Sequence, residues 1–220
     1  MAKKRREKSA IVKLEFDRLD HVYRLPPEFD ELIKDAIRFF NGTPVYPFPL
    51  PKFTGPGVYA IYCIAKKGIY KHFHEVNRTD YRTPIYVGKA VPSGWRKGRS
   101  QSSSTGTLCN RLNEHRRGID RCQNVELTDF QCRFIIMEDE ASDLISALEA
   151  SLIREYNPLW NTVVDGFGNH TPGEGRFDQA KSDWDVIHPG RTWAEKCRGK
   201  STSKRTVLAH VRKYMEGIVS

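Results

Sequence analysis

Residues 57–64 of the chain read GVYAIYCI, a run of β-branched, aromatic and small apolar side chains that begins at a glycine. Such a run predicts a β-strand. Two later runs have the same character and predict two more strands: residues 84–88 (PIYVG), with a strand that ends at the glycine, and residues 130–137 (FQCRFIIM). The sequence pattern therefore predicts three strands.

Helical patterns lie around these strands. The helix expected between the second and third strands has one face made of Leu108, Leu112, His115 and Ile119. Residues 141–156 give the clearest amphipathic pattern, and Asn157-Pro158 ends it. Residues 29–40 and 203–219 predict two further helices, one near each end of the chain. Strands and helices together predict an α+β fold.

The organisation along the chain predicts one small unit of strands and helices with additions. It follows an N-terminal arm and helix in residues 1–50. Residues 164–220 form an extension that we expect to pack on the same domain. Two polar insertions, residues 66–83 and 92–107, interrupt the unit. Loops of that length in a compact domain are usually functional or disordered.

The composition favours a polyanionic partner. The 220 residues carry a formal charge of +9 and a pI of about 9.3, and nucleic acid is the commonest partner of so basic a chain. We expect no membrane partner, because no apolar run approaches the ~20 residues of a spanning helix. The first ten residues are basic and lack the apolar stretch of a secretory signal. The five cysteines are scattered without a CxxC pair, which fits a reducing cytoplasm.

Glu149 stands out among the charged residues. It lies one helical turn from Ile145 and from Ile153, inside the apolar stripe of its helix. A carboxylate there is at least partly buried, and a buried charge is costly unless it is paired or binds a metal. One interpretation is a glutamate that reaches the helix flank or meets an arginine. The other is a metal ligand, since one carboxylate with water molecules suits Mg²⁺.

Arg111 and His115 are four residues apart and are therefore neighbours on one helix face. Two potential cations side by side are unfavourable, and an anion between them would remove the conflict. The guanidinium of arginine binds phosphate in a bidentate manner. The structural alternative is that His115 simply completes the apolar face of the helix.

Four more polar residues accompany them. Tyr59 and Tyr86 lie in neighbouring expected strands, and Lys89 follows the glycine that ends the second strand. Asn161 follows Glu149 by twelve residues. Each residue alone has an ordinary explanation, because strand tyrosines pack in cores and asparagine is common in turns. The order and spacing of the whole set carry the information.

This ordered set resembles the GIY-YIG nuclease superfamily. Its two half-motifs are similar to Gly57-Val58-Tyr59 and Tyr86-Val87-Gly88, and a lysine often follows the second, as Lys89 does here. The resemblance covers roughly residues 53–163. The remaining matches are the helix arginine and histidine, the metal-binding glutamate and the asparagine of the family: Arg111, His115, Glu149 and Asn161.

The resemblance implies a fold and a mechanism. The fold would be a small three-stranded antiparallel sheet flanked by helices, with N- and C-terminal extensions and two insertions. In the mechanism, Glu149 would hold one Mg²⁺, Arg111 would clamp the scissile phosphate, and Tyr59 would deprotonate or orient the attacking water, with Lys89 and the metal as candidates to assist it. The residues expected to position water and phosphate are Tyr86, His115 and Asn161.

The spacing differs from that of short members of the superfamily. The two tyrosines are 27 residues apart and Tyr86 is 25 residues from Arg111, which the two insertions explain. The insertions and the segment 168–176 resemble the type II restriction enzymes of this superfamily that cut CCGCGG. We expect cations in these segments to contact DNA, namely Lys71, Arg78, Arg82, Arg96, Lys97, Arg99 and Arg176.

The sequence therefore predicts a site-specific, Mg²⁺-dependent endonuclease that acts on double-stranded DNA as a homodimer in the cytoplasm. Two alternatives stay open at this point. A repair or structure-specific nuclease would have the same centre without strong sequence preference. A non-catalytic DNA-binding module would have the fold without the activity.

Overall fold

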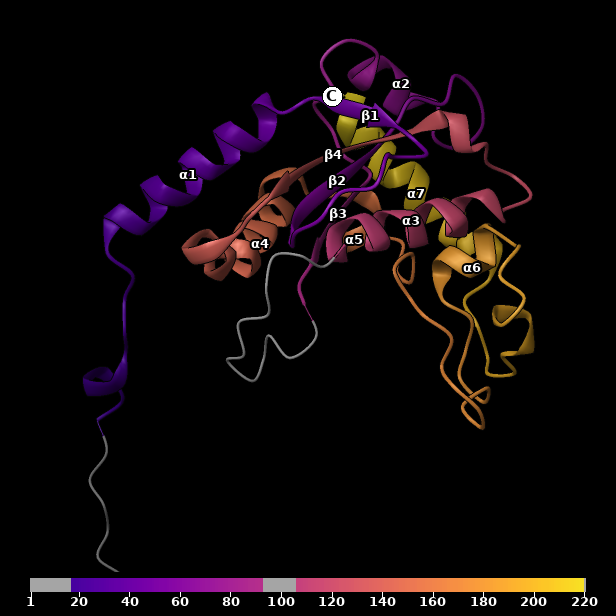
Figure 1. Cartoon of the computed structure of the whole chain (residues 1–220). Coiled ribbons are helices and arrows are strands. Elements are labelled where there is room, and N and C mark those ends of the chain that lie inside the picture. Colours follow the sequence, from indigo (N-terminus) through magenta and orange to yellow (C-terminus); the bar gives the residue numbers. More distant parts are fainter. Residues whose placement is uncertain (1–16, 93–105, 220) are drawn as a thin grey trace, which may run out of the picture.

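The computed structural model describes residues 17–92 and 106–219 of the chain (Figure 1). At its centre is an open antiparallel sheet in the order β1-β4-β2-β3, with helices on both faces. The strands are β1 (Val45–Pro47), β2 (Gly57–Cys63), β3 (Tyr86–Ala90) and β4 (Phe130–Ile136). The expected α+β class is confirmed.

The sheet has four strands where the sequence predicted three. The additional strand, β1, pairs with β4, with Val45 opposite Arg133 and Pro47 opposite Gln131. The proline-rich sequence around β1 concealed it. Proline is tolerated there because β1 is an edge strand, where a missing N–H interrupts no second ladder.

The second strand does not end at Gly88, as the sequence predicted, but continues to Ala90. In the antiparallel register Tyr59 lies opposite Gly88 and Val58 lies opposite Lys89. A side chain on Gly88 would collide with the Tyr59 hydroxyl and approach the Tyr86 ring. The glycine therefore marks a close approach of two tyrosines within the sheet and not a strand end.

The two faces of β2 contribute to two separate cores. Tyr59, Ile61 and Cys63 belong to one buried cluster, and Val58, Ala60 and Tyr62 to the other. This alternation is the period of two that a strand imposes on its side chains. Because helices cover both faces, the whole of β2 is buried.

The helices are α1 (Pro27–Gly42), α2 (His72–Asn77), α3 (Thr107–Asp120), α4 (Ile145–Tyr156), α5 (Leu159–Thr162), α6 (Asp183–Ile187) and α7 (Lys204–Val219). Short 3-10 turns span Arg18–His21, Leu127–Asp129, Asp139–Leu144 and Ala194–Lys196. One core is covered by the C-terminal part of α1 and by α4, and the other by α2, α3, α5, α6 and α7. The catalytic candidates lie mainly on the side of the second core.

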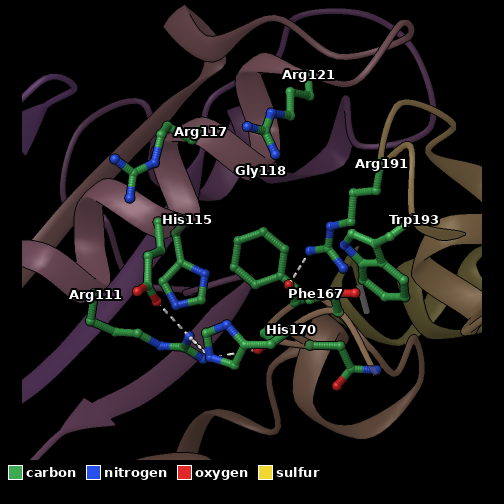
Figure 2. Close-up of a pocket in the computed structure, with 13 residues that line it drawn as sticks. Arg111, His115, Arg117, Gly118, Arg121, Phe167, His170, Arg191 and Trp193 are labelled. Carbon is green, nitrogen blue, oxygen red and sulfur yellow. Dashed lines mark hydrogen bonds and ion pairs between the residues drawn. The ribbon is translucent and has the colours of Figure 1, made fainter. Parts of the chain in front are cut away.

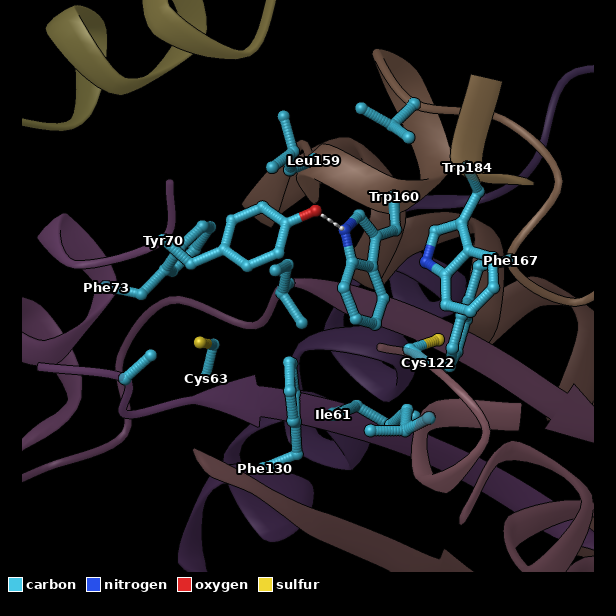
Figure 3. Close-up of a cluster of buried hydrophobic side chains, with 14 of the residues drawn as sticks. Ile61, Cys63, Tyr70, Phe73, Cys122, Phe130, Leu159, Trp160, Phe167 and Trp184 are labelled. Atoms are coloured by element: carbon cyan, nitrogen blue, oxygen red, sulfur yellow. Dashed lines mark hydrogen bonds between the residues drawn. The ribbon is translucent and has the colours of Figure 1, made fainter. Parts of the chain in front are cut away.

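That second core is unusually aromatic and joins distant parts of the chain (Figure 3). Tyr70 comes from the first insertion, Trp160 from α5 and Trp184 from α6, and all three are buried. The Tyr70 hydroxyl accepts a hydrogen bond from Trp160 Nε1 at 2.9 Å and lies 2.6 Å from His188 Nε2. The first insertion and the C-terminal part of the chain therefore share one hydrogen-bonded core.

The N-terminal part of the described chain is less covered. In Figure 1 the start of α1 and the segment before it extend beyond the body of the molecule. Large apolar side chains are exposed there, among them Tyr23 at 79% and Phe39 at 64%. None of the described helices is long and apolar enough to cross a membrane.

Candidate active site

Three aromatic side chains from three elements meet at one point of the fold. Tyr59 on β2, Tyr86 on β3 and His115 on α3 form a triangle. The ring centroids are 6.2 Å apart for the two tyrosines, 5.4 Å for Tyr59 and His115, and 5.3 Å for Tyr86 and His115. The adjacent positions of β2 and β3 and the helix face noted in the sequence thus converge in space.

Tyr59 and His115 are joined by a short hydrogen bond, with the Tyr59 hydroxyl 2.6 Å from His115 Nε2. Burial lowers the pKa of His115 well below its usual value, and the neighbouring charge of Arg111 lowers it further. Burial also raises the pKa of Tyr59 well above its usual value. At neutral pH the imidazole is therefore neutral, and in its Nδ1-protonated tautomer Nε2 accepts the hydrogen bond from the Tyr59 O–H.

Arg111 is held in place from three directions (Figure 2). Its Nη1 donates to Glu114 Oε2 at 2.9 Å and to His170 Nε2 at 2.9 Å, and its Nη2 donates to the Gly168 carbonyl at 3.0 Å. A guanidinium fixed in this way loses little conformational freedom when it binds an anion. The expected neighbourhood of Arg111 and His115 is present, and residues from the C-terminal part of the chain complete it.

Glu149 lies on the first turns of α4, with its side chain 20% exposed, and forms an ion pair with Lys89 on β3. Glu149 Oε2 and Lys89 Nζ are 2.7 Å apart. The carboxylate is close enough to Tyr59 and Tyr86 to raise the pKa of both phenols, although burial is the larger cause. Glu149 therefore faces the tyrosine cluster. The sequence left open whether this carboxylate pairs with an arginine or binds a metal, and its ion-pair partner within the protein is a lysine.

The residues around Glu149 fit a metal ion that has few protein ligands. Among the described residues there is no group of three or more histidine, cysteine or acidic side chains that could enclose an ion. A single carboxylate beside a polar cluster suits Mg²⁺, which keeps several waters and binds through one or two carboxylates. Zn²⁺, which takes three or four protein ligands, does not suit this donor set.

Asn161 lies at the edge of the sheet, and both ends of its amide bind one strand residue. Its Oδ1 accepts from Val87 N and its Nδ2 donates to Val87 O, both at 2.8 Å. The neighbouring Trp160 N donates to Ile85 O at 2.9 Å. The amide thus pairs with the free edge of β3 as another strand would, which fixes the strand that carries Tyr86. The expected role of Asn161 in positioning water or phosphate stays a prediction.

Four residues of the site were missed by the sequence interpretation, and all belong to the C-terminal part of the chain. Phe167 stacks on His115 with centroids 4.6 Å apart, and Gly168 and His170 hold Arg111. Arg191 donates from Nη1 to the Gly166 carbonyl at 2.9 Å and from Nη2 to the Phe167 carbonyl, and so fixes this turn. Only the resemblance of the segment 168–176 pointed to this region, and it pointed to Arg176.

Four of the residues expected to contact DNA belong to the described chain. Lys71, Arg78, Arg82 and Arg176 are exposed, and no hydrogen bond or ion pair joins them to the catalytic candidates within that part of the chain. Arg78 and Arg82 pair with Glu75 at 3.8 Å and Asp80 at 2.5 Å. Arg96, Lys97 and Arg99 lie outside the described residues.

A small antiparallel sheet with paired tyrosines on β2 and β3, a helix with arginine and histidine, and a carboxylate on α4 define a GIY-YIG nuclease. A family model described as the Eco29kI GIY-YIG domain matches residues 51–215 of the chain. The chain therefore belongs to this family of GIY-YIG restriction endonucleases. No curated protein matches the chain.

Proposed function

We propose that this protein is a type II restriction endonuclease that hydrolyses both strands of double-stranded DNA at a palindrome such as CCGCGG. The observation that carries the proposal is the guanidinium of Arg111, held rigid beside the Tyr59–His115 pair. An anion clamp next to a proton-transfer pair is the arrangement that phosphodiester hydrolysis requires.

Arg111 binds the scissile phosphate in this mechanism. Its three hydrogen-bond partners orient the guanidinium before the substrate arrives. As water attacks phosphorus, negative charge grows on the phosphoryl oxygens, and a cation positioned beforehand stabilises that charge without reorganisation. Tyr86, packed against His115, borders the same space.

Tyr59 and His115 transfer the proton. The raised pKa of Tyr59 makes a free phenolate scarce at neutral pH. We therefore infer a relay in which the water proton moves to the Tyr59 oxygen while the Tyr59 proton moves to His115 Nε2, 2.6 Å away. The relay takes one proton from water and leaves one on His115, so that charge balances without a phenolate intermediate. The negative charge of the phosphate bound at Arg111 would offset the low pKa of the buried imidazole.

Glu149 would hold Mg²⁺, and Lys89 would share or yield its place on the carboxylate. When bound, the ion would supply positive charge to the scissile phosphate and its leaving oxygen. Asn161 acts as a positioning residue in this proposal, because it fixes the backbone of β3 at Val87, between the tyrosine and the lysine that border the site.

The working unit in this proposal is a homodimer, because a palindrome presents two equivalent phosphates and one centre cuts one strand at a time. Of the exposed large apolar side chains in the described chain, all but Ile136 lie in residues 19–46. Exposed apolar surface of this kind marks contact with another protein. It favours the N-terminal part over residues 165–220 as the interface.

Sedimentation with a short cognate duplex tests the dimer. We expect two chains per duplex for the wild type. The Phe39→Glu variant places a charge on the exposed face of α1, and we expect it to nick DNA more often than it cuts both strands. One chain per duplex that still cuts both strands without exchange would contradict the dimer.

Digestion of plasmid DNA with and without Mg²⁺, followed by mapping of the ends, tests the function. We expect Mg²⁺-dependent cuts at CCGCGG. Cuts at another palindrome would change the proposed recognition sequence but support the proposed enzyme class. Cuts without sequence preference would support a repair nuclease, and binding without cleavage under any divalent ion would support a DNA-binding module.

The five free cysteines, four of them buried, fit our proposal of a reducing cytoplasm.

A further inference from the structure

A basic pocket lies beside the catalytic cluster, between α3 and the C-terminal part of the chain (Figure 2). Its volume is about 290 Å³. Figure 2 shows Arg117 and Arg121 on the helix side and Arg191 and Trp193 on the opposite side, with Phe167 between them. Since a water molecule takes about 30 Å³ of liquid volume, the pocket has room for a phosphate group and several waters.

The charge of two of the pocket's arginines, Arg117 and Arg121, is not balanced by a carboxylate within the described residues. Arg117 lies in the last turn of α3 and Arg121 is its C-cap residue, so the two like charges are four residues apart at the helix end and repel each other. Neither forms an ion pair within residues 17–92 and 106–219. The one carboxylate in the lining, Glu114, is bound to Arg111 at 2.9 Å. An anion in the pocket would relieve the repulsion between the arginines.

Arg191 places a fixed charge at the back of the pocket. Its side chain is 6% exposed, lies 4.1 Å from the ring of Trp184 and binds the carbonyls of Gly166 and Phe167. Its carboxylate partner, Asp185, is 3.5 Å away. A cation in so confined a position keeps its place whether or not a ligand is bound.

The position of the pocket identifies the ligand as part of a longer polyanion. Arg111 and His115 line it as well, so it is continuous with the catalytic cluster. Along the axis of α3 and its C-cap residue, Arg117 and Arg121 lie about 9 Å and about 15 Å beyond Arg111, at 1.5 Å per residue. Phosphates on one DNA strand follow each other every 3.4 Å or so of helix axis. A strand with its scissile phosphate at Arg111 therefore has its neighbouring phosphates within reach of these arginines.

We propose that the pocket lined by Arg117, Arg121 and Arg191 is a second phosphate site, which binds a backbone phosphate of the cleaved strand next to the scissile one. The proposal rests on the proposed function, because it takes DNA as the substrate. It adds a site outside the residues that the sequence marked for DNA contact. Its role is to fix the register of the strand over the catalytic residues.

The salt dependence of DNA binding without Mg²⁺ gives the first test. For the R117A/R121A double variant we expect the slope of log K against log salt to fall by about 0.9 per lost contact, or roughly eightfold weaker binding per contact at 0.1 M salt. The matched control, R154A/R205A, removes two exposed arginines from α4 and α7, and we expect its slope to equal that of the wild type. R117K/R121K keeps both charges and should restore the slope.

An unchanged slope in R117A/R121A, or an equal loss in the control, would overturn the proposal. Loss of folding is separated by thermal melting. Alanine is the best helix former and the substitution removes a repulsive pair, so the variant should melt no lower than the wild type.

Neutral phosphates identify the DNA contact directly. A methylphosphonate is placed at one position at a time on either side of the mapped cut. At one flanking position we expect the wild type to lose roughly eightfold in affinity, by the same single-contact estimate, and R117A/R121A to lose nothing. The pocket is refuted as a DNA site if no position shows this coupling. It is also refuted if calorimetry finds inorganic phosphate bound to the wild type while the DNA positions stay uncoupled.

Cleavage of unmodified plasmid by the wild type separates the two levels of the proposal. If the wild type cleaves DNA but shows no coupling, only the proposal of a second phosphate site is refuted. If it binds DNA with the expected coupling but never cleaves it, the proposed function is refuted and the proposal of the phosphate site stands.

Discussion

Phe167 lies flat against the imidazole of His115, with ring centroids 4.6 Å apart and ring planes at 13°. Phe167 follows helix α5, whereas His115 belongs to α3. The stack therefore joins the C-terminal part of the chain to the catalytic cluster. Phe167, Tyr59 and Tyr86 all pack against the imidazole, which is buried from water. This burial lowers the pKa of His115.

Removal of the Tyr59 hydroxyl tests the proton relay. We expect Tyr59→Phe to lower the single-turnover cleavage rate by ~10²–10⁴-fold, the usual contribution of general acid–base catalysis. DNA affinity should change little. Tyr70→Phe is a matched control, since Tyr70 also lies 2.6 Å from a buried histidine, His188, but outside the site. A rate loss below about threefold, against the range just given, would make Tyr59 a packing residue.

The Glu149→Gln variant tests the metal ligand. It keeps the shape of the side chain and removes the charge, so we expect no cleavage in Mg²⁺ with DNA binding largely retained. The pair with Lys89 is partly exposed and contributes little to stability, so the melting temperature should stay close to that of the wild type. Glu195→Gln serves as control, because Glu195 pairs with Lys181 at 2.6 Å away from the site. Normal cleavage by Glu149→Gln would rule out the metal role.

The sequence predicted the elements whose pattern is local. The run 57–64 forms β2, and the apolar spacing of residues 141–156 predicted α4. The positions of Tyr59, Tyr86, Arg111 and His115 in one cluster also agree with the expected order of the motif. These features depend on neighbours one or two turns away, and periodicity records them.

Contacts between distant segments leave no periodic pattern in the sequence. Phe167 and Arg191 lie in stretches without helical or strand periodicity, and their roles depend on where the chain returns to α3. Gly88 was misread for the same reason, because the ring that lies over it belongs to Tyr59 on the neighbouring strand. β1 is too short, and too rich in proline, to give a strand signal.

A buried histidine predicts how stability depends on pH. Burial lowers the pKa of His188 to about 3. Between that value and the usual 6.5, the unfolded chain binds a proton that the folded chain does not, so the free energy of unfolding decreases as the pH falls. From pH 7 to pH 5 this effect is about 2 kcal/mol for one such histidine. His115 acts in the same direction.

Urea unfolding at several pH values between 5 and 7.5, above the range where carboxylates usually titrate, measures this dependence. We expect His188→Gln to be less stable than the wild type at pH 7.5, because it disturbs the bond to Tyr70, but to show a flatter dependence on pH. The same slope in both proteins would contradict the assignment to His188.

The turn that carries Phe167 also tests whether the C-terminal segment controls catalysis. A Cβ on Gly168 would lie 2.9 Å from Arg111 Nη2 and 3.0 Å from the Tyr86 hydroxyl. Both groups would have to shift in Gly168→Ala, by less than the displacement of about 1 Å that can cost ~10²-fold in rate at a reacting centre. We expect single-turnover cleavage to fall measurably, by less than that factor, while DNA affinity stays within a few-fold of the wild type. Gly217→Ala is the control: nothing lies within 4 Å of its added Cβ, and it should cleave normally with slightly higher stability, because alanine favours helix α7. If Gly168→Ala cleaves at the wild-type rate, the carbonyl of this residue does not position Arg111 for catalysis.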